Sequence, residues 1–187
     1  MKNARKKFIE GGIYHVYNRG VNKQPIFFQD DDFNLFLGLL DRYVLGNLFD
    51  FNTQTKSYQG RVSLLAFCLL ENHIHLLVQQ KDEKALTEFM HSLMTSFTMR
   101  MNNKYKRVGH LFQGIYKARL ITTDADLINI SRYIHLNAGE TSKEIMFYPY
   151  SSIRMYTGNS EEYLFVDTGI ISGLVSKEQY RGFLDSS

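Results

Sequence analysis

The sequence has a single cysteine, Cys68, so no disulfide framework can hold the chain together. This residue lies in the apolar run 64–70, where a free thiol behaves as a small buried hydrophobe. The basic segment 1–7 is not followed by the apolar region of a signal peptide, and no apolar run reaches the roughly 20 residues that span a bilayer. We therefore expect a cytoplasmic protein with no membrane association.

A second absence is local: residues 89–123 contain no aspartate or glutamate, although the chain carries 22 basic and 19 acidic residues. Basic and aromatic side chains alternate in this stretch. Because basic groups contact phosphates and aromatic rings stack on bases, the composition favours nucleic-acid binding, with an ordinary solvated face as the alternative. The candidate contacts are Arg100, Lys104, Lys106, Arg107, His110, Tyr116, Lys117 and Arg119, together with Arg19 and the N-terminal Lys2, Arg5, Lys6 and Lys7.

The periodicity of apolar residues predicts one α+β domain. Strands are expected at 13–18, 61–70, 73–78 and 115–121, and helices at about 32–45, 85–105, 125–136 and 177–183. The order strand, helix, strand, strand, helix, strand is the βαββαβ order of a ferredoxin-like antiparallel sheet with helices on one face. A further helix, 125–136, follows this unit. We assign residues 1–140 to the catalytic part and 141–187 to a helical tail packed on it.

His73 and His75 alternate with apolar residues along a predicted strand. Side chains two apart leave the same face of a strand, so both imidazoles point away from the face that Ile74, Leu76 and Val78 give to the core. Two imidazoles on one face can offer two nitrogen ligands to a divalent metal ion. The alternative is that both histidines only form hydrogen bonds with their surroundings.

Tyr133 and Asn137 are four residues apart on the last long helix, so they point the same way. A tyrosine hydroxyl beside a metal ion can attack phosphorus and form a covalent phosphotyrosine. Asn137 can contribute its carbonyl oxygen as a third ligand. The alternative is a packing role, since Tyr133 is one of twelve tyrosines.

Five segments in this order resemble the REP-associated tyrosine transposases, relatives of the single-tyrosine HUH transposases of small bacterial insertion sequences. They are GIYHVYNRG at 12–20, NHIHLLV at 72–78, GHLFQGIYKA at 109–118, RYIHLN at 132–137 and YPYSS at 148–152. The resemblance covers residues 10–158. It departs from the family at Ala138, where a proline often follows the asparagine.

The resemblance implies a specific chemistry. His73 and His75 would bind Mg²⁺ or Mn²⁺, with Asn137 completing the metal shell. Tyr133 would attack a phosphate of single-stranded DNA, leaving a 5′-phosphotyrosine and a free 3′-OH near an imperfect hairpin. The loop 109–117, including Gln113, would contact the DNA. Both a monomer and a homodimer remain open.

Three functions are therefore compared. The first is a metal-dependent DNA nicking and joining enzyme with Tyr133 as its nucleophile. The second is a non-catalytic nucleic-acid-binding module on the same fold, which needs only the basic stretch. The third is a metal-dependent phosphodiesterase that uses water, and it lacks a carboxylate within or just after the histidine strand, Glu71 being the nearest.

Overall fold

The computed structural model describes residues 8–46, 56–140, 144–158 and 162–185. Two predicted features lie wholly or partly outside the described residues. They are the N-terminal contacts Lys2, Arg5, Lys6 and Lys7, and the connection between the helix predicted to end at residue 45 and the strand predicted to begin at residue 61.

The centre of the molecule is a four-stranded antiparallel sheet. Its strands are β1 (Ile13–Arg19), β2 (Val62–Leu70), β3 (His73–Gln80) and β4 (Lys117–Ile121), in the spatial order β2-β3-β1-β4. Helices α1 (Asp30–Leu45) and α2 (Ala85–Lys104) connect β1 to β2 and β3 to β4. The predicted ferredoxin-like βαββαβ order is therefore confirmed.

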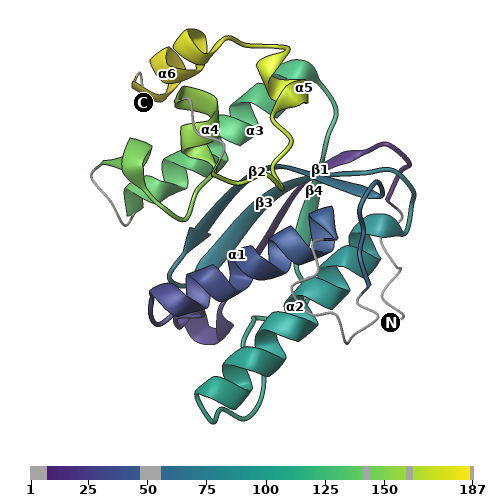
Figure 1. Cartoon of the computed structure of the whole chain (residues 1–187), viewed down its shortest axis with the longest axis vertical. Helices are drawn as coiled ribbons and strands as arrows, with labels where there is room; N and C mark the ends of the chain where they lie inside the picture. The colour runs from purple at the N-terminus through teal and green to yellow at the C-terminus, as the bar shows by residue number, and fades with distance from the viewer. Residues whose placement is uncertain (1–7, 47–55, 141–143, 159–161, 186–187) are drawn as a thin grey trace.

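Helices α1 and α2 cover one face of the sheet (Figure 1). Their apolar stripes, with Phe36, Leu40 and Phe89 among them, pack against inward residues of the strands such as Leu76 and Val78. This is the face predicted for the core. Helix α1 begins two residues before its predicted start because the Asp32 carboxylate accepts the backbone N–H of Gln29 and so caps the first turn.

Helix α3 (Asp124–Leu136) lies on the opposite face together with the C-terminal segment (Figure 1). The Thr123 hydroxyl accepts the backbone N–H of Asp126 and caps it, as predicted, and Leu127, Ile130 and Ile134 are buried against the sheet. The C-terminal segment contains the short helices α4 (Ile153–Thr157), α5 (Gly169–Ser172) and α6 (Lys177–Asp185), and 3₁₀ turns occur at Val21–Lys23, Asn137–Glu140 and Ile145–Phe147. The sheet is thus covered on both faces.

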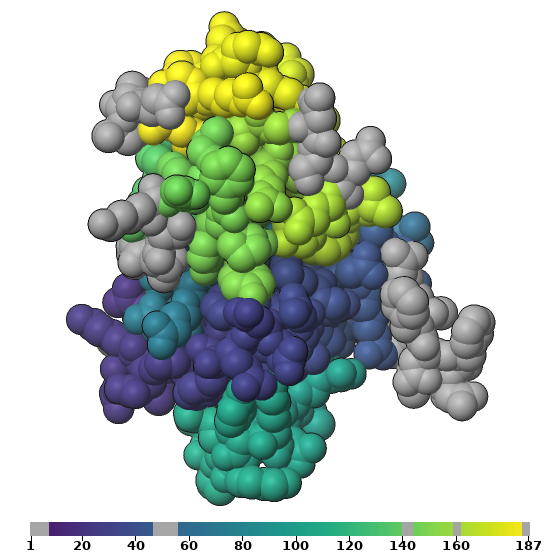
Figure 2. All heavy atoms as spheres, turned by 60° about the vertical axis from the view of Figure 1, so that its left-hand side comes forward, coloured from purple at the N-terminus to yellow at the C-terminus, as the bar shows by residue number. Residues whose placement is uncertain are grey.

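The far end of α2 and the loop after it project from the body of the molecule (Figures 1 and 2). Strand β4 begins at Lys117, two residues later than predicted. Gly114 adopts a left-handed φ of 77°, and Ile115 beyond it is 81% exposed, so the chain is still in a turn at that point. No helix within the described ranges is long and apolar enough to cross a membrane.

A chain of buried hydrogen bonds holds α3 to the C-terminal segment. The His135 imidazole is fully buried, with Nδ1 2.8 Å from the Tyr180 hydroxyl and Nε2 2.8 Å from Ser152 Oγ. Ser152 Oγ also accepts the backbone N–H of Phe67 on β2 at 2.9 Å. Tyr180 donates back to Ser131 Oγ on α3 at 3.0 Å. One histidine therefore ties α3 to β2 and α6.

Burial lowers the pKa of His135 to about 3, so the folded protein keeps this imidazole neutral in a range where the unfolded chain takes up a proton. Stability is therefore complete above pH 6.5 and is lost as pH falls toward 3. We expect His135→Gln to flatten the dependence of the unfolding free energy on pH between 6 and 4 by about 1.4 kcal/mol per pH unit. Urea unfolding across this range measures it.

Tyr180→Phe is the matched control, because it removes a hydrogen-bond partner but leaves the buried imidazole in place. It should lower stability and keep the wild-type slope. Equal slopes for His135→Gln and the wild type would contradict the assignment.

Candidate active site

A cavity of about 370 Å³ opens where the C-terminal end of β1, the N-terminal ends of β3 and β4, and the end of α3 meet. Its walls come from four separate parts of the chain. The lining residues are Tyr17, Asn18, Arg19, His73, His75, Gln113, Ile115, Lys117, Tyr133 and Asn137. Both predicted histidines, the predicted tyrosine and the predicted asparagine therefore lie around one space.

The two histidines leave β3 on the face opposite α1 and α2. Their ring centroids are 5.1 Å apart and the rings are nearly perpendicular. His73 Nδ1 lies 2.5 Å from Asn72 Oδ1, and His75 Nδ1 lies 2.9 Å from His15 Nε2 on the neighbouring strand. Because Nδ1 is engaged in both rings, Nε2 is the nitrogen that each would present to a metal ion.

Burial keeps two of these imidazoles neutral. It lowers the pKa of His75 to about 3, with the neighbouring His15, His73 and Arg19 adding to the effect. It lowers the pKa of His15 to about 4, with Arg119 contributing. A neutral imidazole is the form that binds a metal ion, so at neutral pH His75 has no charge to lose before it can act as a ligand.

Tyr133 lies over the histidines from α3. Its ring meets His75 edge-on at a centroid distance of 5.7 Å and His15 at 5.9 Å. The side chain is 49% exposed, so a substrate can reach it from solvent. Asn137, one turn later, is buried, and its Nδ2 donates to the Tyr133 carbonyl oxygen at 2.6 Å. This bond leaves the amide oxygen of Asn137 as the atom available to an ion.

Two imidazole nitrogens and one amide oxygen can hold a divalent ion that takes its other ligands from water and substrate, and they do not distinguish Mg²⁺ from Mn²⁺. No group of three or more His, Cys, Asp or Glu side chains suited to a metal ion occurs in the part of the chain that the structure describes. His73, His75 and Asn137 supply two nitrogens and one amide oxygen. Mg²⁺ sites in enzymes commonly keep several waters and take oxygens from substrate phosphates, so an incomplete protein shell suits that use.

The rim of the cavity is positive. Arg19 and Lys117 both line it and are exposed, and the Lys117 ammonium lies 5.8 Å from the ring centroid of Tyr17. None of the described lining residues is acidic. The positive electrostatic potential of two cations at a concave surface attracts an anionic substrate.

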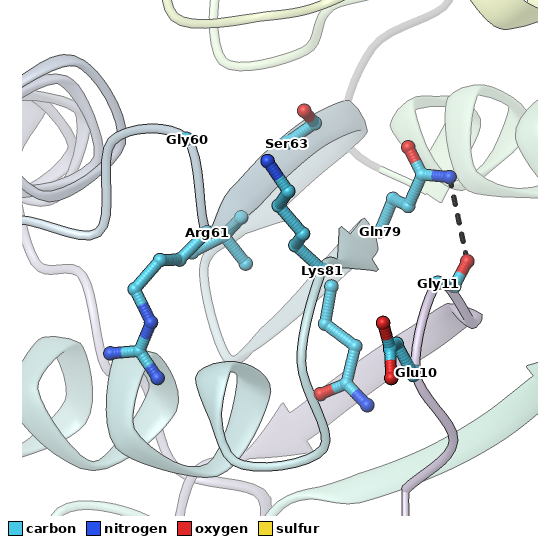
Figure 3. Close-up of a pocket in the computed structure, with 9 residues that line it drawn as sticks. Glu10, Gly11, Gly60, Arg61, Ser63, Gln79 and Lys81 are labelled. Carbon is cyan, nitrogen blue, oxygen red and sulfur yellow. Dashed lines mark hydrogen bonds between the residues drawn. The ribbon is translucent and has the colours of Figure 1, made fainter.

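A second cavity of the same volume lies at the other end of the sheet, where β1 begins and β3 ends (Figure 3). Its polar groups form ion pairs and hydrogen bonds that stabilise the fold. Arg61 extends away from it and pairs with Asp82 and Glu88, while Gln79 donates to the Gly11 carbonyl oxygen. This cavity contains no histidine or tyrosine, so we assign the chemistry to the first one.

Residues 48–137, just under half of the chain, match the family model described as "Transposase IS200 like". The matched stretch contains His73, His75, Lys117, Tyr133 and Asn137. Over this stretch the chain is similar to the IS200-like transposases. This match supports a DNA nicking and joining enzyme.

One solved structure shares the fold of this chain. A REP-associated tyrosine transposase bound to a REP hairpin is 14% identical, with a TM-score of 0.57 over 83% of this chain and 84% of that chain. A candidate transposase from Deinococcus radiodurans R1 is 17% identical, with a TM-score of 0.43 over 72% of this chain and 95% of that chain. No curated protein matches the sequence.

The predicted DNA contacts separate into three groups. Arg19, Gln113 and Lys117 line the cavity itself. Arg100, Lys104, Lys106, Arg107 and His110 lie at the projecting end of α2 and in the loop after it, and Tyr116 is half-buried at the end of that loop. Arg119 is on β4.

Two of these predicted contacts already have acidic partners. Lys104 Nζ lies 2.7 Å from the carboxylate of Asp32, which is fully buried, and Arg119 makes two hydrogen bonds of 2.9 Å to Asp126. DNA contacts through these two cations would have to compete with those bonds.

Of the residues that β1 contributes to the site, the sequence predicts Arg19 alone. It gives no role to His15, Tyr17 and Asn18, yet Tyr17 and Asn18 line the cavity and His15 contacts His75. A signal was present, because His15 and Tyr17 alternate just as His73 and His75 do. The pairing of the two strands was needed to bring these pairs together.

Proposed function

We propose that this protein is a transposase that nicks and rejoins single-stranded DNA through a covalent bond to Tyr133. The observation that carries the proposal is the convergence of Tyr133, His73, His75 and Asn137 on one positively rimmed cavity. Chain segments more than 50 residues apart supply these four side chains, and each predicted role requires the others nearby.

The reaction is a phosphoryl transfer in which the bonds balance. The Tyr133 oxygen attacks a backbone phosphorus and gives up its proton, while the bond from phosphorus to the 3′ oxygen of the preceding nucleotide breaks and that oxygen takes up a proton. The products are a 5′-phosphotyrosine and a free 3′-OH. Because one phosphodiester replaces another, a 3′-OH can reverse the step and rejoin a strand.

A divalent ion, Mg²⁺ or Mn²⁺, held by His73, His75 and Asn137 would polarise the phosphate and spread its developing charge. The fold of the chain orients the metal ligands and the nucleophile. Burial fixes both imidazoles, and the hydrogen bond from Asn137 to the Tyr133 carbonyl couples the third donor to the helix turn that bears the nucleophile. Arg19 and Lys117 would draw the DNA backbone toward the rim.

We further propose that the substrate carries a hairpin and that one chain forms a complete site. A fold relative binds a REP hairpin, and the projecting basic end of α2 gives this chain a surface on which a folded strand could lie. Helix α3 packs on the sheet of its own chain, so Tyr133 meets the histidines without a partner subunit. A homodimer is not needed for this geometry.

The deciding experiment incubates the protein with labelled single-stranded hairpin oligonucleotides and Mn²⁺ and follows the label on a denaturing gel. The wild type should give a covalent protein–DNA band. Tyr133→Phe should give none, because phenylalanine has no hydroxyl to attack phosphorus. Tyr163→Phe, which removes a hydroxyl outside the cavity, is the control and should leave the band.

Changing both His73 and His75 to alanine should abolish the band and keep most of the DNA affinity. Cleavage without an adduct that persists in Tyr133→Phe would indicate hydrolysis by water. DNA binding with neither cleavage nor adduct across the hairpins would indicate a non-catalytic module.

A matched pair of lysines tests which cations bind DNA. Lys117→Gln should weaken single-stranded DNA binding several-fold and reduce the slope of log affinity against log salt by about 0.7, the value for one phosphate contact. Lys104→Gln should leave that slope unchanged and lower stability, because Lys104 neutralises the buried Asp32. Fluorescence anisotropy at several salt concentrations measures both. An unchanged slope for Lys117→Gln would contradict the proposed rim.

A further inference from the structure

We infer that His15 is a positioning residue that fixes the tautomer and the ring orientation of His75, so that Nε2 of His75 faces the cavity with a free electron pair. The inference rests on the proposed function only in that His75 is taken as a metal ligand. His15 does not line the cavity, and it acts through its hydrogen bond to His75.

The register of the sheet creates this contact. Strand β1 pairs with β3 so that Tyr17 lies directly opposite His75, and His15 is two residues along the same face. The two imidazoles stack with their centroids 5.1 Å apart and their planes 15° apart, and His15 Nε2 lies 2.9 Å from His75 Nδ1. Both side chains are only 5% exposed, so water does not compete well for this hydrogen bond.

A neutral imidazole carries one N–H, so a bond between two imidazoles forces a choice of donor. If His75 Nδ1 accepts, its proton is on Nε2, which then cannot bind a cation. If Nδ1 donates to His15 Nε2, the electron pair is on His75 Nε2 and the proton of His15 is on Nδ1. Only in the second arrangement can Nε2 of His75 bind a metal ion.

The other predicted ligand, His73, also has its Nδ1 in a hydrogen bond, and there the chemistry of the partner determines which atom donates. His73 Nδ1 faces Asn72 Oδ1, and the amide of Asn72 is oriented by its Nδ2, which donates to the Lys23 carbonyl oxygen at 3.3 Å. An amide oxygen only accepts, so His73 Nδ1 donates. His15 therefore does for His75 what Asn72 does for His73. Partners of this kind around metal ligands typically change metal affinity by about 10- to 100-fold when removed.

The alternative is that His15 only fills space between the rings of Tyr17 and His75, since it stacks on Tyr17 at 5.0 Å. Two variants separate the roles. His15→Phe keeps an aromatic ring but removes the acceptor. His15→Gln places an amide oxygen near the position of Nε2 and can still accept from His75. Thermal unfolding of both variants reports any loss of packing.

The first readout needs neither metal nor variant: long-range ¹H–¹⁵N spectra of the metal-free wild type assign the tautomer of His75. We expect the proton on Nδ1, and a proton on Nε2 would overturn the inference. The second readout is Mn²⁺ binding by calorimetry. His15→Phe should bind at least about tenfold more weakly than the wild type, and His15→Gln should stay within about threefold of it. Equal affinity for His15→Phe and the wild type would also overturn it.

Failure of the proposed function looks different. In that case the wild type binds no Mn²⁺, or its binding is unchanged when His73 and His75 are both replaced by alanine. The tautomer measurement then still decides whether His15 directs the proton of His75.

Discussion

The antiparallel pairing of β1 with β3 is the constraint on which the site depends. It places His15 and Tyr17 beside His75, and it aligns the ends of both strands under the C-terminus of α3. A shift of one residue in this register would turn every side chain of one strand to the opposite face. The apolar residues of β3 that alternate with the histidines, Ile74, Leu76 and Val78, are buried under α1 and α2, so the core itself fixes the register.

The two faces of the sheet have different roles. One face is filled mainly by apolar residues that α1 and α2 cover. The other is shared, because α3 and the C-terminal segment pack on its β2 side, and the cavity opens toward the end of β1. His135, tied to Ser152 and Tyr180, holds α3 from the side away from Tyr133. The same helix can therefore present a half-exposed tyrosine on a rigid support, as preorganised sites require.

What the sequence could predict was set by local periodicity. Alternation along a strand placed His73 and His75 on one face, and the spacing of one helical turn placed Tyr133 and Asn137 together, because neither inference needs a distant contact. The roles of these residues came from the resemblance to the REP-associated tyrosine transposases. The order of the elements was enough for the ferredoxin-like sheet. The role of β1 was not accessible, because the contact between His15 and His75 joins residues 60 apart through strand pairing. The ion pair of Lys104 with Asp32, 72 residues away, was hidden for the same reason.

The central claim is that ligands from two separate elements and the nucleophile meet at one ion. Crystals of the protein grown with Mn²⁺ and a short single-stranded oligonucleotide test it directly, because anomalous scattering locates manganese without prior assumptions. We expect a peak bonded to Nε2 of both His73 and His75 and to the Asn137 amide oxygen, beside the Tyr133 hydroxyl. Manganese bound through an Nδ1 atom, or at no position near Tyr133, would contradict it.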